Sequence, residues 1–331
     1  MDVTVSPPAA YEDRHAGLIV FGILEILFGL FCMLMIPLML FGQAVAARQG
    51  GAPLDVGLIA PTLLTFFTLA VAAIWLGVGS IQARRWARAL LLCLGWIGLV
   101  CGVAALVFVV PTLSTMERAM QNQARPLPPA AVVVAKVVTV MTIVVFYILL
   151  PGTLVLFYRS RHVKQTCETR DPIARWTDRC PLPVLAMVLL QAFGGAYILT
   201  MFRIGAALPF AGTLVTGWPA RLIWYVFGTF SLWAAWGFYR LKPVAWRVYT
   251  VGILLFGTSS LVSLLRVDLL DYYRAIGFPE AQIERLAASP VFHGHSLVGM
   301  SSLCLLGVAA YLFYLRRFFV ADPPEPPPIT S

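Results

Sequence analysis

Residues 17–41 read Gly17-Leu-Ile-Val-Phe-Gly-Ile-Leu-Glu25-Ile-Leu-Phe-Gly29-Leu-Phe-Cys-Met-Leu-Met-Ile-Pro-Leu-Met-Leu-Phe41. A helix needs about 20 consecutive apolar residues to cross the hydrocarbon core of a bilayer. This stretch is longer than that and holds one charged residue, Glu25. Ala44-Val45-Ala46 resembles a signal-peptide cleavage site, but the apolar run exceeds the 7–15 residues of a signal core. The stretch therefore predicts a retained transmembrane helix.

The rest of the chain has the same character. It has 331 residues, of which 60% are hydrophobic and 12% are charged, whereas a soluble domain carries about 25% charged residues. Such a chain needs lipid as part of its solvent. We predict an all-α integral membrane protein with eight transmembrane helices, at 17–41, 57–81, 88–110, 131–158, 182–203, 220–240, 246–266 and 294–319.

The net charge of +9 follows the positive-inside rule, so it does not predict a nucleic-acid partner. Basic residues without acids occupy the turns around Arg85 and Lys242, and six arginines and lysines follow the fourth span. These segments fall on one side, which predicts that both termini are cytoplasmic. Arginines outnumber lysines 21 to 3, which favours a GC-rich genome and a bacterial inner membrane.

Features of the first half recur in the second. Glu25-Ile-Leu-Phe-Gly29 and Gln191-Ala-Phe-Gly-Gly195 lie at similar depths in spans one and five, and short basic turns end at Trp86 and Trp246. This order predicts a tandem duplication, whose two parallel four-helix repeats are related by an axis along the membrane normal. The predicted segments are a disordered N-terminus 1–16, a first repeat 17–158, a cytoplasmic linker 159–181, a second repeat 182–319 and a disordered Pro-rich tail 320–331.

Glu25 is the sharpest functional candidate. A carboxylate inside a span is costly to keep ionised, so such residues usually face the interior of a helix bundle. There Glu25 would bind a proton or a cation, or it would bond to a neighbouring helix for structural reasons. Gln191 takes the same place in the second repeat, and an amide cannot ionise. The two residues are predicted to lie at the interface between the repeats.

Two further groups hold chemistry outside the membrane. His293 and His295 begin the eighth span and predict either an outer-face polar site or a polar helix start. In the linker, His162, Cys167 and Cys180 are candidate zinc ligands, although no Cys-x-x-Cys pair supports them. The alternative is a basic linker lying against anionic lipid. No other cofactor is predicted.

Catalytic motifs are missing from the sequence. It contains no Walker A motif and no His-Glu-x-x-His, and its four histidines fall at or outside span ends, which disfavours a haem held between helices. These absences favour a protein that is not an enzyme. The leading hypothesis is a small-molecule or ion transporter that uses Glu25. The alternatives are a scaffold or accessory subunit, bound to a membrane protein partner or to its own copies, and a membrane enzyme using the outer histidines.

Overall fold

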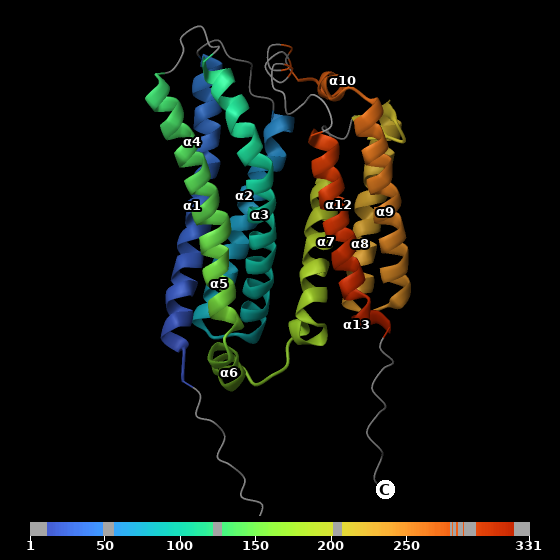
Figure 1. The fold of residues 1–331 in the computed structure, drawn as a ribbon. Coiled ribbons are helices and arrows are strands. Elements are labelled where there is room, and N and C mark those ends of the chain that lie inside the picture. The colour runs from blue at the N-terminus through green and yellow to red at the C-terminus, as the bar shows by residue number, and fades with distance from the viewer. Residues whose placement is uncertain are drawn as a thin grey trace, which may run out of the picture. The chain divides into compact units, whose positions relative to one another are not determined.

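The computed structural model describes residues 12–48, 56–121, 128–200, 207–278, 280, 283, 287 and 296–320 (Figure 1). Nearly all of them are helical. Within these ranges, seven helices are long and apolar enough to cross a membrane. The chain is therefore a multi-pass helical membrane protein, as its composition predicts.

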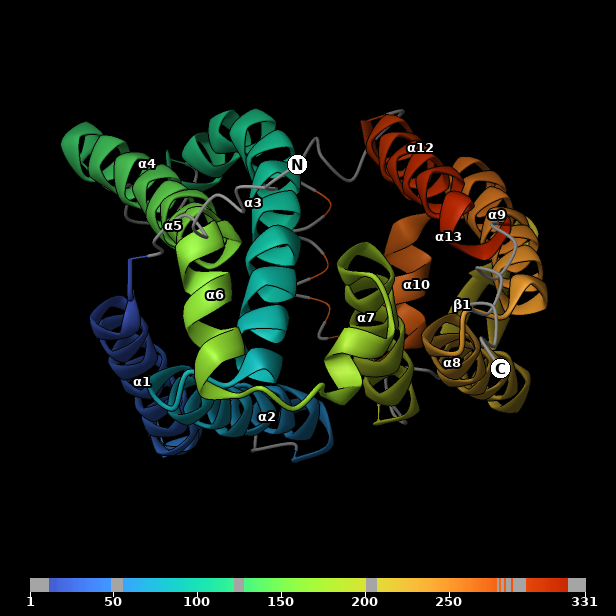
Figure 2. The same ribbon diagram turned by 90° about the horizontal axis from the view of Figure 1, so that it is seen from below.

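The chain divides into two compact units, formed by residues 1–103 with 143–179 and by residues 104–142 with 180–331. The first unit contains α1 and α2, which lie side by side (Figure 2), followed by the start of α3. A π-helical segment, η1, leads into α5, and two short helices follow it. The bounds are α1 His15–Arg48, α2 Val56–Ile81, α3 Arg85–Gln121, η1 Val144–Leu149, α5 Leu150–Arg159, α6 Arg161–Arg170 and η2 Trp176–Arg179.

The second unit contains the end of α3, helix α4 and the remaining elements. Its helix α7 packs against α8, and α9 packs against α8 and α12. Between α7 and α8 lies an antiparallel hairpin in which Ala207 pairs with Thr216, a small departure from the predicted all-α fold. The bounds are α4 Pro129–Ile143, α7 Leu182–Thr200, β1 Ala207–Phe210, β2 Thr213–Thr216, α8 Trp218–Tyr239, α9 Pro243–Arg266, α10 Leu269–Ala275, α12 Ser296–Leu315 and α13 Arg317–Val320.

Helix α8 corresponds to the span predicted at 220–240, but it is not one of the seven apolar helices. Its sequence includes Arg221 and several tryptophans and tyrosines, whose polar groups lower the mean hydropathy. Such aromatic residues are typical of the membrane interface. The structure thus confirms that this segment is helical, while its crossing of the bilayer stays a prediction.

The turn between α2 and α3 has the same geometry as the turn between α8 and α9. Ala83 and Leu241 both have positive φ angles, of 51° and 50°. The next amide donates to a carbonyl five residues earlier in both turns, Arg84 to Gly79 and Lys242 to Gly237, at 2.9 Å in each case. This pattern is a Schellman helix ending. It aligns Gly79 with Gly237 and Ala83 with Leu241.

Each unit has its own buried centre on the side of these turns. In the second unit Phe238 is fully buried, and its ring meets the rings of Tyr249 and Phe319 edge to face. In the first unit the largest fully buried side chain is Tyr158, and the Phe21 ring lies against Phe157 at 4.4 Å. The centre of the second unit is Val184, Met187, Ala234, Phe238, Ala245, Tyr249, Leu312, Leu315 and Phe319.

Candidate functional site

Helices α1 and α2 approach each other through small residues on either side of Glu25. A Cβ atom added to Gly22 would lie 2.6 Å from the Gly77 carbonyl oxygen, and one added to Gly29 would lie 2.8 Å from that of Ala70. The two backbones are therefore in direct contact, as small residues permit in membrane helices. Glu25 lies between these contacts, which fix its depth and direction.

The Glu25 side chain is half-buried. It lies ten residues after the start of α1, about 15 Å along the helix axis. Glu25 lies seven residues, about two helical turns, after the fully buried Leu18, so it lies on the same face of α1 as Leu18. No hydrogen bond or ion pair joins Glu25 to another residue of the described ranges. The carboxylate thus lies among helices without a fixed cationic partner there.

A chain of hydrogen bonds connects α1, α2 and α5 near the start of α1. The Ser80 hydroxyl donates to the Leu18 carbonyl at 2.9 Å and lies 2.6 Å from the Tyr158 hydroxyl. Because Ser80 has one hydroxyl proton and uses it on Leu18, Tyr158 is the donor in the second bond. Ser80 and Tyr158 are 1% and 0% exposed. The arrangement places a buried, hydrogen-bonded tyrosine hydroxyl near Leu18, about two helical turns before Glu25 on α1.

Gln191, the predicted counterpart of Glu25, lies on α7. A Cβ atom added to Gly195, four residues later, would lie 2.8 Å from the Gly228 carbonyl oxygen of α8, which resembles the contact between Gly29 and Ala70. Gln191 is 4% exposed, and neither its amide nitrogen nor its oxygen has a hydrogen-bond partner among the described residues. A buried amide without partners is costly. Whether Glu25 and Gln191 share an interface stays a prediction.

The linker 159–181 contains helix α6, which the sequence prediction left out. Val163, Thr166 and Cys167 form its buried face, and their spacing of three and four residues is the amphipathic signal that was available in the sequence. The N-terminus is attached to this helix: Arg14 donates its backbone N–H to Thr166 Oγ1 at 3.1 Å, and Arg170 pairs with Asp13 at 3.0 Å. Arg170 also lowers the pKa of Asp13.

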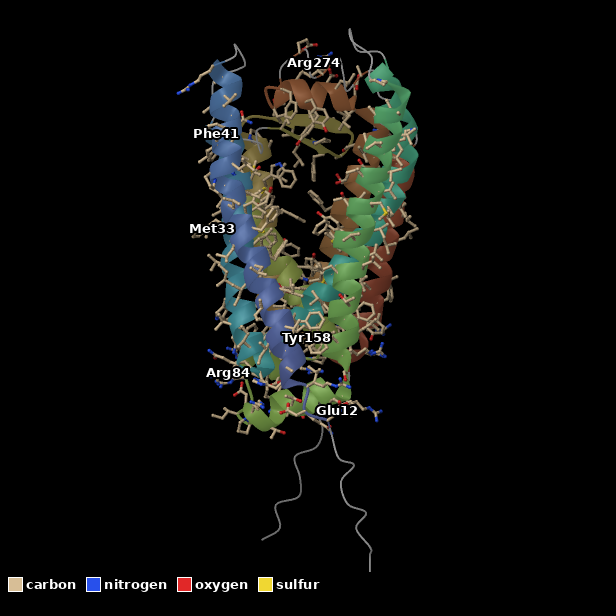
Figure 3. The ribbon with its side chains drawn as sticks, turned by 90° about the vertical axis from the view of Figure 1, so that its left-hand side faces the viewer. Glu12, Met33, Phe41, Arg84, Tyr158 and Arg274 are labelled. Atoms are coloured by element: carbon tan, nitrogen blue, oxygen red, sulfur yellow. The ribbon has the colours of Figure 1, made fainter. Side chains whose placement is uncertain are left out.

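Asp171 connects the linker to the turn between α2 and α3. The carboxylate is 2% exposed and pairs with Arg175 at 2.7 Å and with Arg84 at 3.9 Å, while the Arg85 backbone N–H donates to it at 3.3 Å. The bond from Arg175 lowers the pKa of Asp171 below its usual value. Figure 3 shows Arg84 at the same end of the first unit as Tyr158 and Glu12. The basic residues of this end are therefore partly neutralised by acids of the linker.

The candidate zinc ligands are placed as follows. His162 accepts a hydrogen bond from the Glu12 backbone N–H at 3.2 Å, and the Cys167 and Cys180 thiols are buried. Burial raises the pKa of each thiol to about 11, so both are protonated at neutral pH. In the part of the chain that the structure describes, no three His, Cys, Asp or Glu side chains are grouped to hold a metal ion. The zinc site stays a prediction.

His293 and His295 lie outside the described residues. Earlier in the chain, Asp268 caps helix α10 by accepting from the Leu270 backbone N–H at 2.9 Å. Between residues 279 and 295 the structure describes residues 280, 283 and 287, which are helical, and Ile283 is buried. The outer-face histidine site stays a prediction as well.

Comparisons with known proteins return no match to a family model, to a curated protein or to a solved structure.

Proposed function

We propose that this multi-pass membrane protein is a transporter of a small molecule or an ion, with Glu25 as its ionisable site. The observation that carries the proposal is the Glu25 carboxylate, which lies half-buried inside a membrane-crossing helix and without a cationic partner in the described ranges. Acidic residues at such a depth are usually functional. A carboxylate without a fixed counter-ion can exchange a proton or a cation, which is the step that coupled transport needs.

Covalent labelling with dicyclohexylcarbodiimide tests the ionisable site directly. This apolar reagent reacts with protonated carboxyl groups inside membranes. We expect labelling at Glu25, read by peptide mass spectrometry, and we expect it to fall as pH rises and when the transported cation is added. Glu168 is the matched internal control, because it pairs with Arg85 and Lys164 at the protein surface. An unlabelled Glu25 from pH 5 to 8 would contradict the proposal.

Flux measurements test transport itself. Purified protein in liposomes with an internal pH dye is offered panels of inorganic cations and small organic acids and amines. We expect one class to drive proton movement, and we expect Glu25→Gln to abolish it while Gln191→Glu leaves it or adds to it. Flux with unchanged pH dependence in Glu25→Gln removes the proposed role of Glu25. Labelling without flux for every panel member favours the scaffold hypothesis.

We also propose that the chain is a tandem duplication with eight spans. The matching Schellman turns, the crossings of Gly29 with Ala70 and of Gly195 with Gly228, and the positions of α6 and α13 support it. A single residue separates α5 from α6, and a single residue separates α12 from α13. In this proposal α8 is the eighth span, and the two repeats have the same orientation.

Both termini are proposed to be cytoplasmic, in a bacterial inner membrane. Alkaline phosphatase, which is active only outside the cytoplasm, distinguishes the orientations. We expect an inactive enzyme when it is fused after Arg240 in the basic turn and an active one when it is fused after Thr213 in the hairpin. The opposite pair of activities would invert the orientation, and equal activities would mean that α8 does not cross the bilayer.

A further inference from the structure

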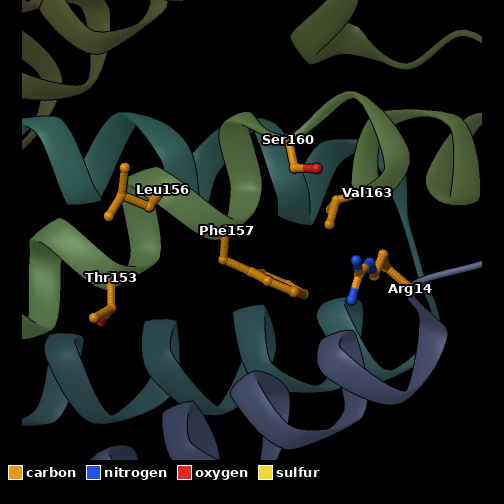
Figure 4. Close-up of a pocket in the computed structure, with 6 residues that line it drawn as sticks. All are labelled: Arg14, Thr153, Leu156, Phe157, Ser160 and Val163. Carbon is orange, nitrogen blue, oxygen red and sulfur yellow. The ribbon is translucent and has the colours of Figure 1, made fainter. Parts of the chain in front are cut away.

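A cleft of about 350 Å³ lies in the first unit where α1 begins, α5 ends and α6 begins. Figure 4 shows the side chains around it. The cleft lies at the ends of two membrane-crossing helices, His15–Val45 and Ala130–Arg159, and so at the level where lipid headgroups meet the hydrocarbon. Its lining residues are Arg14, Thr153, Leu156, Phe157, Ser160 and Val163.

One wall of the cleft is held rigidly. A Cβ atom added to Gly17 would lie 2.6 Å from the Phe157 ring, so the ring rests directly on the backbone of α1. The Phe157 ring also packs against the Phe21 ring, and the two ring centres are 4.4 Å apart. Because the Phe157 ring is packed in this way, the cleft does not need to be opened by a rearrangement.

The lining changes from apolar to basic along the cleft. Leu156, on the last turns of α5, is 75% exposed, and Thr153 one turn earlier is exposed as well. Both belong to a membrane-crossing helix, so this end is open to hydrocarbon. Arg14, before the first turn of α1, marks the other end, and the exposed Arg159 and Arg161 flank Ser160.

Arg14 is positioned to meet an anion. Its backbone N–H is fixed on Thr166 Oγ1, and its guanidinium lies beside Phe157 and Val163 (Figure 4). Glu12 accepts from one terminal nitrogen at 2.6 Å, but a guanidinium has five N–H donors and can serve a second acceptor. Ser160 precedes α6 without making a capping hydrogen bond through its side chain, so its hydroxyl is available to the same ligand.

We propose that this cleft binds one anionic phospholipid drawn from the bilayer. Its phosphate diester is held by Arg14 and Ser160, and one acyl chain lies along Leu156 and Thr153. The three arginines favour an anionic headgroup over a zwitterionic one, because each basic residue near a membrane surface adds attraction for anionic lipid. The apolar end distinguishes a lipid from a soluble phosphate ester. The site is independent of the role proposed for Glu25.

Spin-labelled lipids in detergent-free nanodiscs test the site. The motionally restricted fraction of labelled phosphatidylglycerol is measured against that of labelled phosphatidylcholine, at equal amounts of lipid. We expect the protein to prefer phosphatidylglycerol, and we expect Arg14→Gln to reduce the preference about fivefold, the effect of one basic residue at a membrane surface. Arg247→Gln is the matched control, because it removes an exposed arginine at the start of α9 in the second unit.

Further measurements distinguish a lipid phosphate from a soluble phosphate ester, and loss of binding from loss of folding. Thr153→Phe leaves the basic end intact and fills the apolar end, so it should weaken binding of long-chain phosphatidylglycerol and leave a short-chain analogue unaffected. Soluble glycerol phosphate should not compete; competition at millimolar concentration would assign the cleft to a soluble ester and overturn the lipid proposal. An Arg14→Gln variant that keeps its thermal melting point and the full preference would also overturn it.

Discussion

The two units share a helix turn and a close helix crossing, and they differ in the side chains buried near that turn. In both units a Schellman turn joins neighbouring helices, and a pair of small residues brings two helix backbones together. When the two turns are aligned, Ser80 corresponds to Phe238. Ser80 bonds to Tyr158, whereas Phe238 packs among aromatic rings. Turns and small residues thus set the helix positions, while the side chains buried near the turns differ: the Ser80 and Tyr158 hydroxyls in the first unit and the rings around Phe238 in the second.

Disrupting the close contact between α1 and α2 should have the largest effect on the free energy of unfolding. Gly22→Ala places a Cβ atom 2.6 Å from the Gly77 carbonyl oxygen, so α1 and α2 must move apart. We expect a loss of about 3 kcal/mol in the free energy of unfolding, the upper part of the usual range for overpacking. The measurement is equilibrium unfolding in mixed micelles. Gly194→Ala is the control, since no atom lies within 4 Å of its added Cβ; equal losses in both variants would refute the argument.

Removing the buried carboxylate of the first unit should have the next largest effect. Asp171→Asn leaves Arg175 and Arg84 without their shared partner, which should cost about 2 kcal/mol. The exposed pair of Asp271 and Arg274 in the second unit is the comparison, and Asp271→Asn should cost less than about 1 kcal/mol. Unfolding of both variants is followed by circular dichroism.

The Asp171 contribution should depend on pH in a definite direction. Its pKa is lowered in the folded protein by Arg175, so the contribution is present above the unfolded pKa of about 3.9 and is lost as pH falls through the folded value. The wild type should therefore lose its greater stability over Asp171→Asn as pH falls below the folded pKa of Asp171. A difference between the two that stays constant down to pH 2 would show that the carboxylate charge is not its source.

The polar interior of the first unit should give the smallest effect and the sharpest test. Ser80→Ala leaves the buried Tyr158 hydroxyl without its acceptor and should cost about 1–2 kcal/mol. Tyr158→Phe should cost less, because Ser80 keeps its bond to Leu18. A double-mutant cycle should then give a cost below the sum of the two. In the second unit, Tyr311→Phe removes a bond to the Pro183 carbonyl and offers a half-exposed comparison; additive Ser80 and Tyr158 effects would argue against a coupled pair.

Sequence patterns located the helices better than the contacts between them. Apolar runs marked the bounds of α2, α7 and α9 to within three residues and those of α1 to within seven, because hydropathy is a local property. Marking the repeat by Trp86 and Trp246 was two residues off the structural register, since the turn geometry aligns Trp246 with Arg88 instead. Tryptophan at a helix end reflects the membrane interface and does not fix a turn.

The sequence by itself determined that this is a membrane protein, approximately where its long apolar helices lie and that Glu25 is an ionisable residue inside one of them. These conclusions follow from the length of the apolar runs and from the single charge within the first. Only the tertiary structure decided that Ser80 bonds to Tyr158 and Leu18, that Asp171 is buried among arginines and that Arg14 borders a cleft. Those neighbours are far apart in the chain, and which of them meet depends on how backbones approach at Gly22 and Gly29.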